Sequence, residues 1–218
     1  MRIAVLGAGL QGSACAYDLL RQPDVEAVVL VDRRADRLAP FLEPLRGPRL
    51  VVRAADFRDA GAVADVLAGV RVALCAAPYY FNEPLARAAI EAGVHFSDLG
   101  GNTEIVWRQR AMDAEARARG VTVVPDVGLA PGLANVLAAE GIRRLDRADE
   151  VRLYVGGLPQ HPEPPLYYQV VYSLEGVLDY YTTPSWILRD GRRVQVESLS
   201  EVEPVEFEGL GRLEAFHT

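Results

Sequence analysis

The sequence predicts an α/β protein, in which a doubly wound parallel sheet is followed by a second, smaller α+β domain with a mixed or antiparallel sheet. Three observations favour this fold class. A short apolar run, Ile3–Leu6, ends in a glycine-rich turn. Strand-length apolar runs then alternate with segments of helical period up to about Gly128. Beyond Asp149 apolar and polar residues alternate, which is typical of antiparallel sheet with one solvent-exposed face.

The glycine-rich turn has the sequence Gly-Ala-Gly-Leu-Gln-Gly and lies between the first predicted strand and a helix. Gly7 permits the tight turn, Gly9 lets the backbone approach a pyrophosphate, and Gly12 lets the helix pack on the sheet. Leu10 and Gln11 begin the helix, whose free N–H groups and dipole favour a bound anion. In this context the pattern is the dinucleotide-binding fingerprint of a Rossmann domain.

Charged residues follow the next two strands and bear on the choice of coenzyme. Asp32 ends the second strand, where its carboxylate can accept hydrogen bonds from the adenosine ribose. Because a carboxylate repels a 2′-phosphate, we expect NAD rather than NADP. Arg33 and Arg34 come next, and either one could stack on adenine, bind the phosphate or remain solvated. Asp56, after the third strand, could contact adenine or cap the following helix.

The remaining elements of the first domain follow from the same alternation. Strands buried on both faces are expected to be short and apolar, and the predicted ones are Arg2–Leu6, Ala27–Val31, Leu50–Ala54, Val70–Ala76, Val94–Ser97 and Val121–Pro125. The predicted helices are Leu10–Arg21, Arg34–Leu45, Ala60–Ala68, Glu83–Ala92 and Glu104–Arg119, with a further helix from Pro131 to Leu145. Gly93 stands where a C-cap glycine belongs, and Asn102 or Thr103 can cap the helix that follows.

We place the domain boundary near Gly128, with a dinucleotide-binding domain at residues 1–128 and a substrate or dimerisation domain at 129–218. In the second domain Glu150–Gly156 alternates like a half-buried strand. Tyr167–Tyr172 and a helix near Leu174–Tyr181 follow a loop rich in Gly and Pro. Asp190-Gly191 predicts the turn of a β-hairpin.

Composition excludes several classes of function. The chain has 218 residues and a net charge of −7 without a basic stretch, so we expect neither nucleic acid nor membrane as a partner. The first strand begins at once, which leaves no room for a signal peptide, and we expect a cytoplasmic protein. The scattered histidines predict no metal site. All 23 Lys and Arg residues are Arg, so a lysine Schiff base or lysine general base within this chain is excluded.

Six stretches resemble a known family: Gly-Ala-Gly-Leu-Gln-Gly at 7–12, Cys-Ala-Ala-Pro-Tyr-Tyr-Phe-Asn at 75–82, Asp-Leu-Gly-Gly-Asn-Thr at 98–103, Pro-Asp-Val-Gly-Leu-Ala-Pro-Gly-Leu-Ala-Asn at 125–135, Gly-Gly-Leu-Pro at 156–159 and Leu-Glu-Ala-Phe-His-Thr at 213–218. Over its whole length the chain resembles the saccharopine dehydrogenase and L-lysine 6-dehydrogenase family of amino-acid oxidoreductases. Family members continue past the position that matches Thr218, so the resemblance implies an incomplete second domain.

The resemblance implies an NAD-dependent oxidoreductase that acts on the C–N bond of lysine or of a saccharopine-like secondary amine. Hydride transfer would produce an imine, which water then opens. We expect a small amino-acid substrate and a homodimer. Two alternatives stay open. One is a catalytically impaired dinucleotide-binding or dimerisation protein derived from this family, and the other is a different Rossmann amino-acid dehydrogenase.

Ligands of a doubly wound sheet lie beyond the carboxyl ends of its strands, which places the candidate residues. Those expected around the coenzyme are Ala76, Ala77 and Pro78 after the fourth strand and Val127 and Gly128 after the sixth. Without lysine, the proton acceptor is an Asp, Glu, His, Tyr or water. The candidate catalytic residues are Asp98, Asp126 and Tyr80. Each aspartate could instead cap the turn that follows it, and the tyrosine could be a packing residue.

Overall fold

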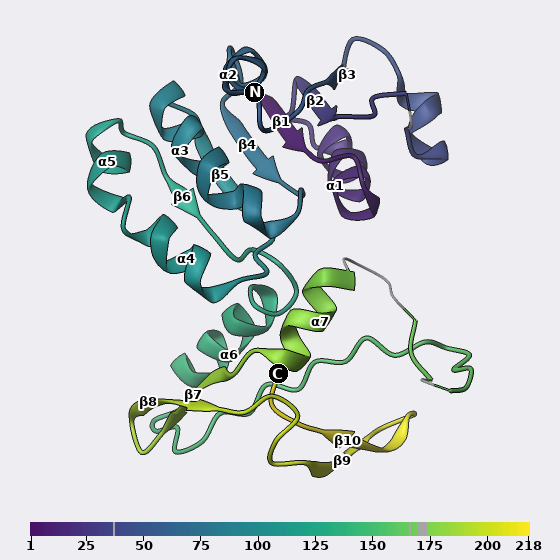
Figure 1. Cartoon of the computed structure of the whole chain (residues 1–218), viewed down its shortest axis with the longest axis vertical. Coiled ribbons are helices and arrows are strands. Elements are labelled where there is room, and N and C mark those ends of the chain that lie inside the picture. Colours follow the sequence, from purple (N-terminus) through teal and green to yellow (C-terminus); the bar gives the residue numbers. More distant parts are fainter. Residues whose placement is uncertain (37, 166, 170–173) are drawn as a thin grey trace. The chain divides into compact units, whose positions relative to one another are not determined.

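The computed structural model describes residues 1–36, 38–165, 167–169 and 174–218 (Figure 1). The chain divides into two compact units, Met1–Val151 and Arg152–Thr218. The first unit holds the parallel sheet with its helices, and the second holds a helix and two small antiparallel sheets. The domain boundary near Gly128 is predicted from a change in the sequence pattern. The division into compact units does not test it, so it stays a prediction.

Among the described residues, six parallel strands form one sheet in the order β3-β2-β1-β4-β5-β6. They are β1 (Arg2–Leu6), β2 (Ala27–Asp32), β3 (Leu50–Ala54), β4 (Val72–Cys75), β5 (His95–Asp98) and β6 (Val123–Val124). Strand order reverses between β1 and β4, which is the point where doubly wound sheets bind ligands. The predicted fold class is confirmed, although β4 and β6 are shorter than predicted.

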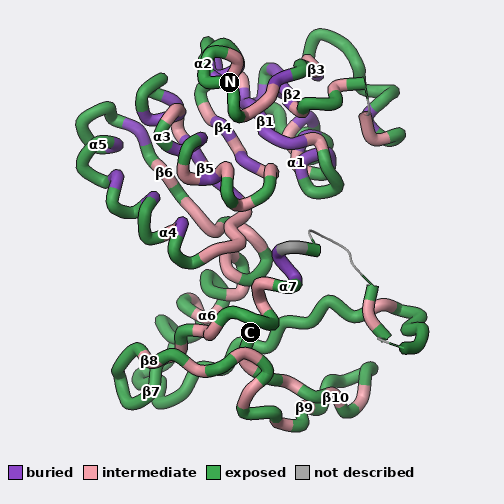
Figure 2. Tube along the Cα trace, viewed as in Figure 1, coloured by how far each residue is buried: buried purple, intermediate pink, exposed green. Residues whose placement is uncertain are grey.

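Helices cover both faces of this sheet. On one face α1 (Leu10–Arg21) packs Ala16 and Leu20 against alternate residues of the central strands, including Val5 and Leu30. On the other face α2 (Ala60–Leu67) and α3 (Asn82–Ala92) pack against the intervening residues, such as Leu6 and Val31. Figure 2 shows the buried residues concentrated in these layers. Burial on both faces explains why the strands are almost uninterrupted apolar runs.

Two predicted helices are wrong in part. Among the described residues of the segment Arg34–Leu45, the structure shows only a 3-10 helix, η1 (Pro40–Leu45), because Pro40 starts it and Pro44 removes a backbone donor. The segment Glu104–Arg119 is two helices, α4 (Thr103–Arg110) and α5 (Asp113–Ala118), separated by a turn that buries Met112. The Asn102 side chain accepts the Ile105 N–H at 3.1 Å and caps α4 as predicted.

The last helix of the first unit is α6 (Leu133–Arg143), which begins two residues later than predicted. The second unit contains α7 (Leu174–Thr182) and the strand pairs β7 (Ser185–Arg189) with β8 (Arg192–Val196) and β9 (Glu203–Phe207) with β10 (Gly211–Ala215). The hairpin predicted at Asp190-Gly191 is confirmed, with φ of 52° and 71° at its two turn residues.

Two further segments of the second domain, Glu150–Gly156 and Tyr167–Tyr172, are not confirmed as predicted. Glu150–Gly156 has no strand structure, and among the described residues no strand pairs with it to complete its hydrogen bonds. Half of Tyr167–Tyr172, residues 170–172, lies outside the described residues. Across the described segments, every helix is too short or too polar to cross a membrane.

Gly12 lets α1 pack closely on the turn after β1, and this contact generates a prediction. A Cβ on Gly12 would overlap the Gly7 carbonyl oxygen, whereas a Cβ on Gly9 would have no heavy atom within 4 Å. We expect Gly12→Ala to lower the free energy of unfolding by about 1–3 kcal/mol, measured by urea denaturation. Gly9→Ala is the matched control and should leave stability within about 0.5 kcal/mol. Equal stability of the two variants would contradict the close packing.

Candidate functional site

The glycine turn of the first unit presents open backbone beyond the end of β1. Gly7 has a φ of 109°, and a Cβ there would lie 2.8 Å from the Ala76 carbonyl. The Gly7 N–H donates to the Val31 carbonyl at 2.7 Å, which joins the turn to β2. Gly9 is the N-cap residue of α1 and has no side chain with which to cap the helix. The N–H groups of the first turn of α1, which includes the exposed Leu10 and Gln11, are therefore not capped by a side chain. This arrangement suits a bound phosphate group.

The Asp32 carboxylate is engaged within the protein. Its Oδ2 accepts the Ala8 N–H at 2.9 Å, and its Oδ1 accepts the Arg34 N–H at 2.9 Å. The side chain thus joins the glycine turn to the turn after β2. Each carboxylate oxygen already has a donor, so the charge that was expected to select the ribose is partly neutralised by backbone dipoles.

A cavity of about 270 Å³ lies beside the glycine turn. The predicted site residues that line it are Gly7, Gly9, Asp32, Arg33, Asp56, Ala76, Ala77, Pro78 and Tyr80. They come from the turns after four neighbouring strands, because the carboxyl ends of parallel strands meet at one edge of a sheet. Leu10, Gln11, Gly12, Asp98, Asp126, Val127 and Gly128 are not among its lining residues.

Sequence reasoning missed several residues that line this cavity, namely Ala55, Phe57, Arg58 and Phe81. The rings of Phe57 and Phe81 meet edge to face at 5.7 Å, so the loop after β3 contacts the loop after β4. Arg58 carried a usable signal, because it stands two residues after Asp56 as Arg34 stands two residues after Asp32. The Asp56 carboxylate accepts the Arg58 N–H at 3.0 Å, which repeats the geometry at Asp32.

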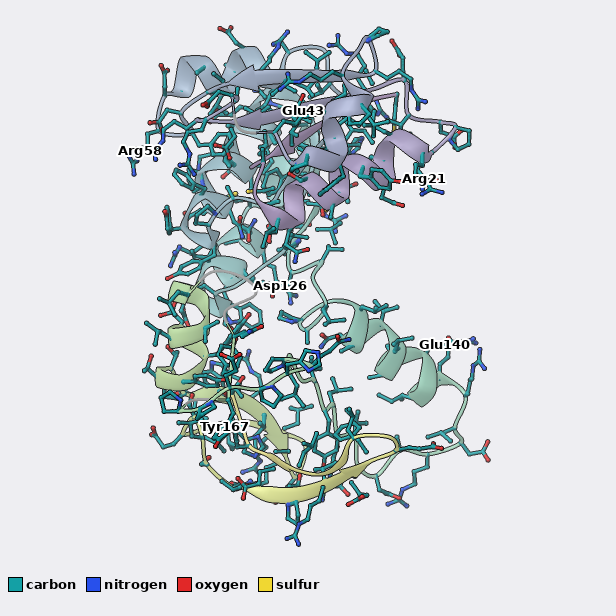
Figure 3. All side chains as sticks on the ribbon, turned by 90° about the vertical axis from the view of Figure 1, so that its right-hand side faces the viewer. Arg21, Glu43, Arg58, Asp126, Glu140 and Tyr167 are labelled. Atoms are coloured by element: carbon teal, nitrogen blue, oxygen red, sulfur yellow. The ribbon has the colours of Figure 1, made fainter. Side chains whose placement is uncertain are left out.

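Two arginine side chains give the cavity rim positive charge. Arg33 and Arg58 both line the cavity and are exposed, and within the described residues neither guanidinium group has an ion-pair partner. Figure 3 shows Arg58 at the edge of the first unit. Since the neighbouring carboxylates already accept backbone N–H groups, these two cations are free to bind an anionic ligand.

A separate acidic cluster lies at the ends of β5 and β6. Asp98 is fully buried, and its Oδ1 accepts the N–H groups of Gly100 at 2.8 Å and Asp126 at 3.2 Å. Its Oδ2 accepts the Gln109 side-chain amide at 2.7 Å. The backbone N–H of Val127 donates to the Asp98 carbonyl at 2.8 Å. This complete set of donors favours the structural alternative for Asp98, which fixes the loop after β6.

Asp126 differs from its neighbour in conformation and hydrogen bonding. It has a φ of 59°, and its buried Oδ1 has no hydrogen-bond partner in the described part of the chain. Burial, and then the charge of Asp98, raise its pKa to about 6, while the Gly101 N–H lowers it. Gly128 packs against the Leu99 carbonyl at the base of the same loop. The pKa of the Asp126 carboxyl group therefore lies well above the usual range of an aspartate.

Between the cavity and the acidic cluster lies a short turn, η2 (Tyr79–Phe81). Tyr80 lines the cavity, and Tyr79 lies against Gly101, where an added Cβ would approach the tyrosine Cβ to 3.1 Å. The Asn82 side chain donates to the Gly100 carbonyl at 3.4 Å. The turn after β4 therefore contacts both groups of predicted site residues.

The sheet order, the glycine turn and the cavity beside it define a dinucleotide-binding domain of the doubly wound class. Residues 3–124 match the family model described as saccharopine dehydrogenase NADP binding domain, and residues 128–218 match the model described as saccharopine dehydrogenase C-terminal domain. The chain belongs to the saccharopine dehydrogenase family.

Individual relatives agree with this assignment. The chain is 26% identical over 202 residues to saccharopine dehydrogenase (NADP⁺, L-glutamate-forming) from Saccharomyces cerevisiae, which covers 90% of this chain and 44% of that protein. It is 31% identical over 143 residues to mitochondrial alpha-aminoadipic semialdehyde synthase from Mus musculus, which covers 60% of this chain and 15% of that protein. The chain thus spans less than half the length of these relatives.

Among solved structures, apo saccharopine dehydrogenase (L-Glu forming) from Saccharomyces cerevisiae matches with a TM-score of 0.75 at 21% sequence identity. The match covers 99% of this chain and 49% of that chain. At this identity the likeness shows the fold.

The expectation of NAD, with NADP less favoured, is wrong. The family model over residues 3–124 is an NADP binding domain, and the yeast relative is an NADP⁺ enzyme by name. The physical reason lies in the contacts of Asp32, whose carboxylate is held by the Ala8 and Arg34 N–H groups. The carboxylate of Asp32 is thus no evidence against a 2′-phosphate. Arg33 and Arg58 line the same cavity and have no ion-pair partner among the described residues.

The contacts of Asp98 generate a stability prediction. Asp98→Ala would leave one buried and two part-buried donors without an acceptor, and we expect the free energy of unfolding to fall by about 3 kcal/mol. Asp113→Ala is the control, because this exposed residue forms a surface ion pair with Arg117 and should change stability by less than about 1 kcal/mol. Urea denaturation measures both, and similar losses would show that the Asp98 network contributes little.

Proposed function

We propose that this chain binds NADP⁺ and belongs to an oxidoreductase that acts on the C–N bond of an amino acid, with a saccharopine-like secondary amine as the substrate class. The observation that carries the proposal is the cavity at the glycine turn with Arg33 and Arg58 on its rim. Membership of the saccharopine dehydrogenase family supports it, as do the names of the relatives.

The residues present fit the coenzyme. The open backbone at Gly9 leaves room for a pyrophosphate beside the N-terminus of α1, since no heavy atom lies within 4 Å of a Cβ built there. The cavity of about 270 Å³ is at the small end of ligand sites, which usually enclose about 300–1,000 Å³, so we assign to it the adenosine half. Arg33 and Arg58 would pair with the 2′-phosphate, because guanidinium groups bind phosphate oxygens with two donors.

The coenzyme, when bound, supplies the hydride acceptor. The residues of this chain would position the amine and take up its proton. Tyr80 lines the cavity, and the same turn after β4 contacts Gly101, next to the Asp126 side chain, through Tyr79; we assign this side of the site to the substrate.

Two measurements on the 218-residue chain test the proposed function. Calorimetry should detect NADP⁺ binding that is at least roughly tenfold tighter than NAD⁺ binding, the difference of about 1.4 kcal/mol expected from one good phosphate contact. Steady-state assays that follow NADPH absorbance should show turnover with saccharopine rather than lysine. Absence of binding to either coenzyme would overturn the proposal, and binding without turnover would favour a non-catalytic dinucleotide-binding protein.

The arginine rim generates the matching mutational prediction. Arg33→Ala should weaken NADP⁺ binding by about 1.5–3 kcal/mol, or roughly tenfold to a hundredfold, because a charge-assisted phosphate contact is lost. NAD⁺ binding should stay within about twofold, since that coenzyme lacks the phosphate. Arg58→Ala should act in the same direction, whereas Arg119→Ala, outside the cavity lining, serves as the control. Equal weakening of both coenzymes by Arg33→Ala would place the side chain away from the 2′-phosphate.

A further inference from the structure

The two aspartates at the ends of β5 and β6 have different physical roles, and the difference begins with their hydrogen bonds. Asp98 is fully buried and accepts three N–H groups through its two oxygens. One of the three donors is the N–H of Asp126, so the buried carboxyl group of Asp98 holds the backbone from which the second carboxyl group projects.

Asp126 has an unfavourable backbone conformation for a residue with a side chain. Its φ of 59° lies in the left-handed region, and such conformations persist where the surrounding contacts enforce them. The carboxyl group packs against Gly100, where an added Cβ would overlap its Oδ1. Gly100 has a φ of 81°, so the turn after β5 is shaped to leave space for this side chain.

The surroundings of Asp126 leave it able to take up and release a proton. Its buried Oδ1 has no partner among the described residues, and the Gly101 N–H is the donor that favours the charged form. The charged group that faces it from the neighbouring strand is Asp98, while Gly100 and Gly101 offer backbone only. Burial and the Asp98 charge raise the pKa of Asp126 to about 6. A base with a pKa slightly below the working pH is ionised at neutrality and still a useful proton acceptor.

We infer that Asp126 accepts the proton that the substrate amine must lose before hydride transfer, and that Asp98 is the positioning residue that holds it for this role. The inference rests on the proposed function and names the acid–base group of that site. The chain contains no lysine, and Asp126 supplies a carboxylate that can accept a proton at this edge of the sheet.

The proposed step balances in atoms and electrons. A secondary ammonium group of the substrate, R₂CH–NH₂⁺–R′, gives one N–H proton to the Asp126 carboxylate and becomes the neutral amine. The C–H bond then breaks, its hydrogen and electron pair leave as hydride to the oxidised coenzyme, and the nitrogen lone pair forms the C=N bond of the iminium product. Asp126 returns its proton to solvent before the next turnover.

The first test needs neither coenzyme nor activity. Carbon-13 NMR of the side-chain carboxyl groups in the wild-type chain should show Asp126 titrating with a midpoint near pH 6, a signal that Asp126→Asn removes. Asp98→Asn should lower that midpoint, because it removes the neighbouring negative charge. A midpoint near pH 4 in the wild type would overturn the role of Asp126, and an unchanged midpoint in Asp98→Asn would overturn that of Asp98.

The second test measures the pH dependence of kcat/KM with saccharopine and NADP⁺. The wild type should lose activity as the pH falls through about 6, because Asp126 becomes protonated and no longer accepts a proton. Asp126→Asn should reduce kcat/KM by roughly a hundredfold or more and abolish this acid limb, with NADP⁺ affinity unchanged. Asp113→Asn, an exposed control outside the site, should keep both the rate and the limb.

The outcomes separate this inference from the function on which it rests. If the wild type fails to bind NADP⁺, the proposed function is overturned, while the NMR titration still decides whether Asp126 is a near-neutral acid. If NADP⁺ binds and saccharopine is turned over, but Asp126→Asn retains the wild-type pH profile, the assignment of the proton acceptor is overturned. The wild-type titration requires no substitution, so a poorly folded variant would not leave the question undecided.

Discussion

The carboxylate of Asp32 connects the two turns on which the nucleotide site depends. It accepts the Ala8 N–H from the glycine turn and the Arg34 N–H from the turn after β2, each at 2.9 Å. The Gly7 N–H adds a bond to the Val31 carbonyl. These bonds fix the two turns to each other, and because both oxygens of Asp32 already accept N–H groups, its charge does not by itself select against a phosphate.

The same arrangement recurs one strand further along the sheet. Asp56 accepts the Arg58 N–H two residues later, as Asp32 accepts the Arg34 N–H. In both turns a carboxylate stabilises the backbone that carries arginine, because aspartate readily accepts an N–H two residues ahead. The cavity rim carries two acids and two bases, and the hydrogen bonds show that the acids are engaged, whereas Arg33 and Arg58 have no ion-pair partner among the described residues.

The parts of the fold that could be predicted from the sequence are those that a local pattern of residues determines. The strands of the sheet were predictable because burial on both faces requires apolar runs, and the glycine turn because its backbone conformations exclude other residues. The helix predicted over Arg34–Leu45 was wrong because Pro40 and Pro44 override its apolar period. The strand predicted at Glu150–Gly156 failed for another reason: alternation shows which residues could share a face, whereas a strand also needs a partner, and pairing is a property of the fold.

The candidate site shows the same limit at the level of single residues. Phe57, Arg58 and Phe81 join the cavity through the meeting of loops far apart in the chain, which no local pattern reports. Asp98 and Asp126 look alike in the sequence, since each follows a strand at the same edge. Depth separates them: the fully buried Asp98 accepts three donors and fixes the loop, whereas partial burial, and then the neighbouring Asp98, raise the pKa of Asp126. This difference in surroundings is why we propose Asp126, and not Asp98, as the proton acceptor.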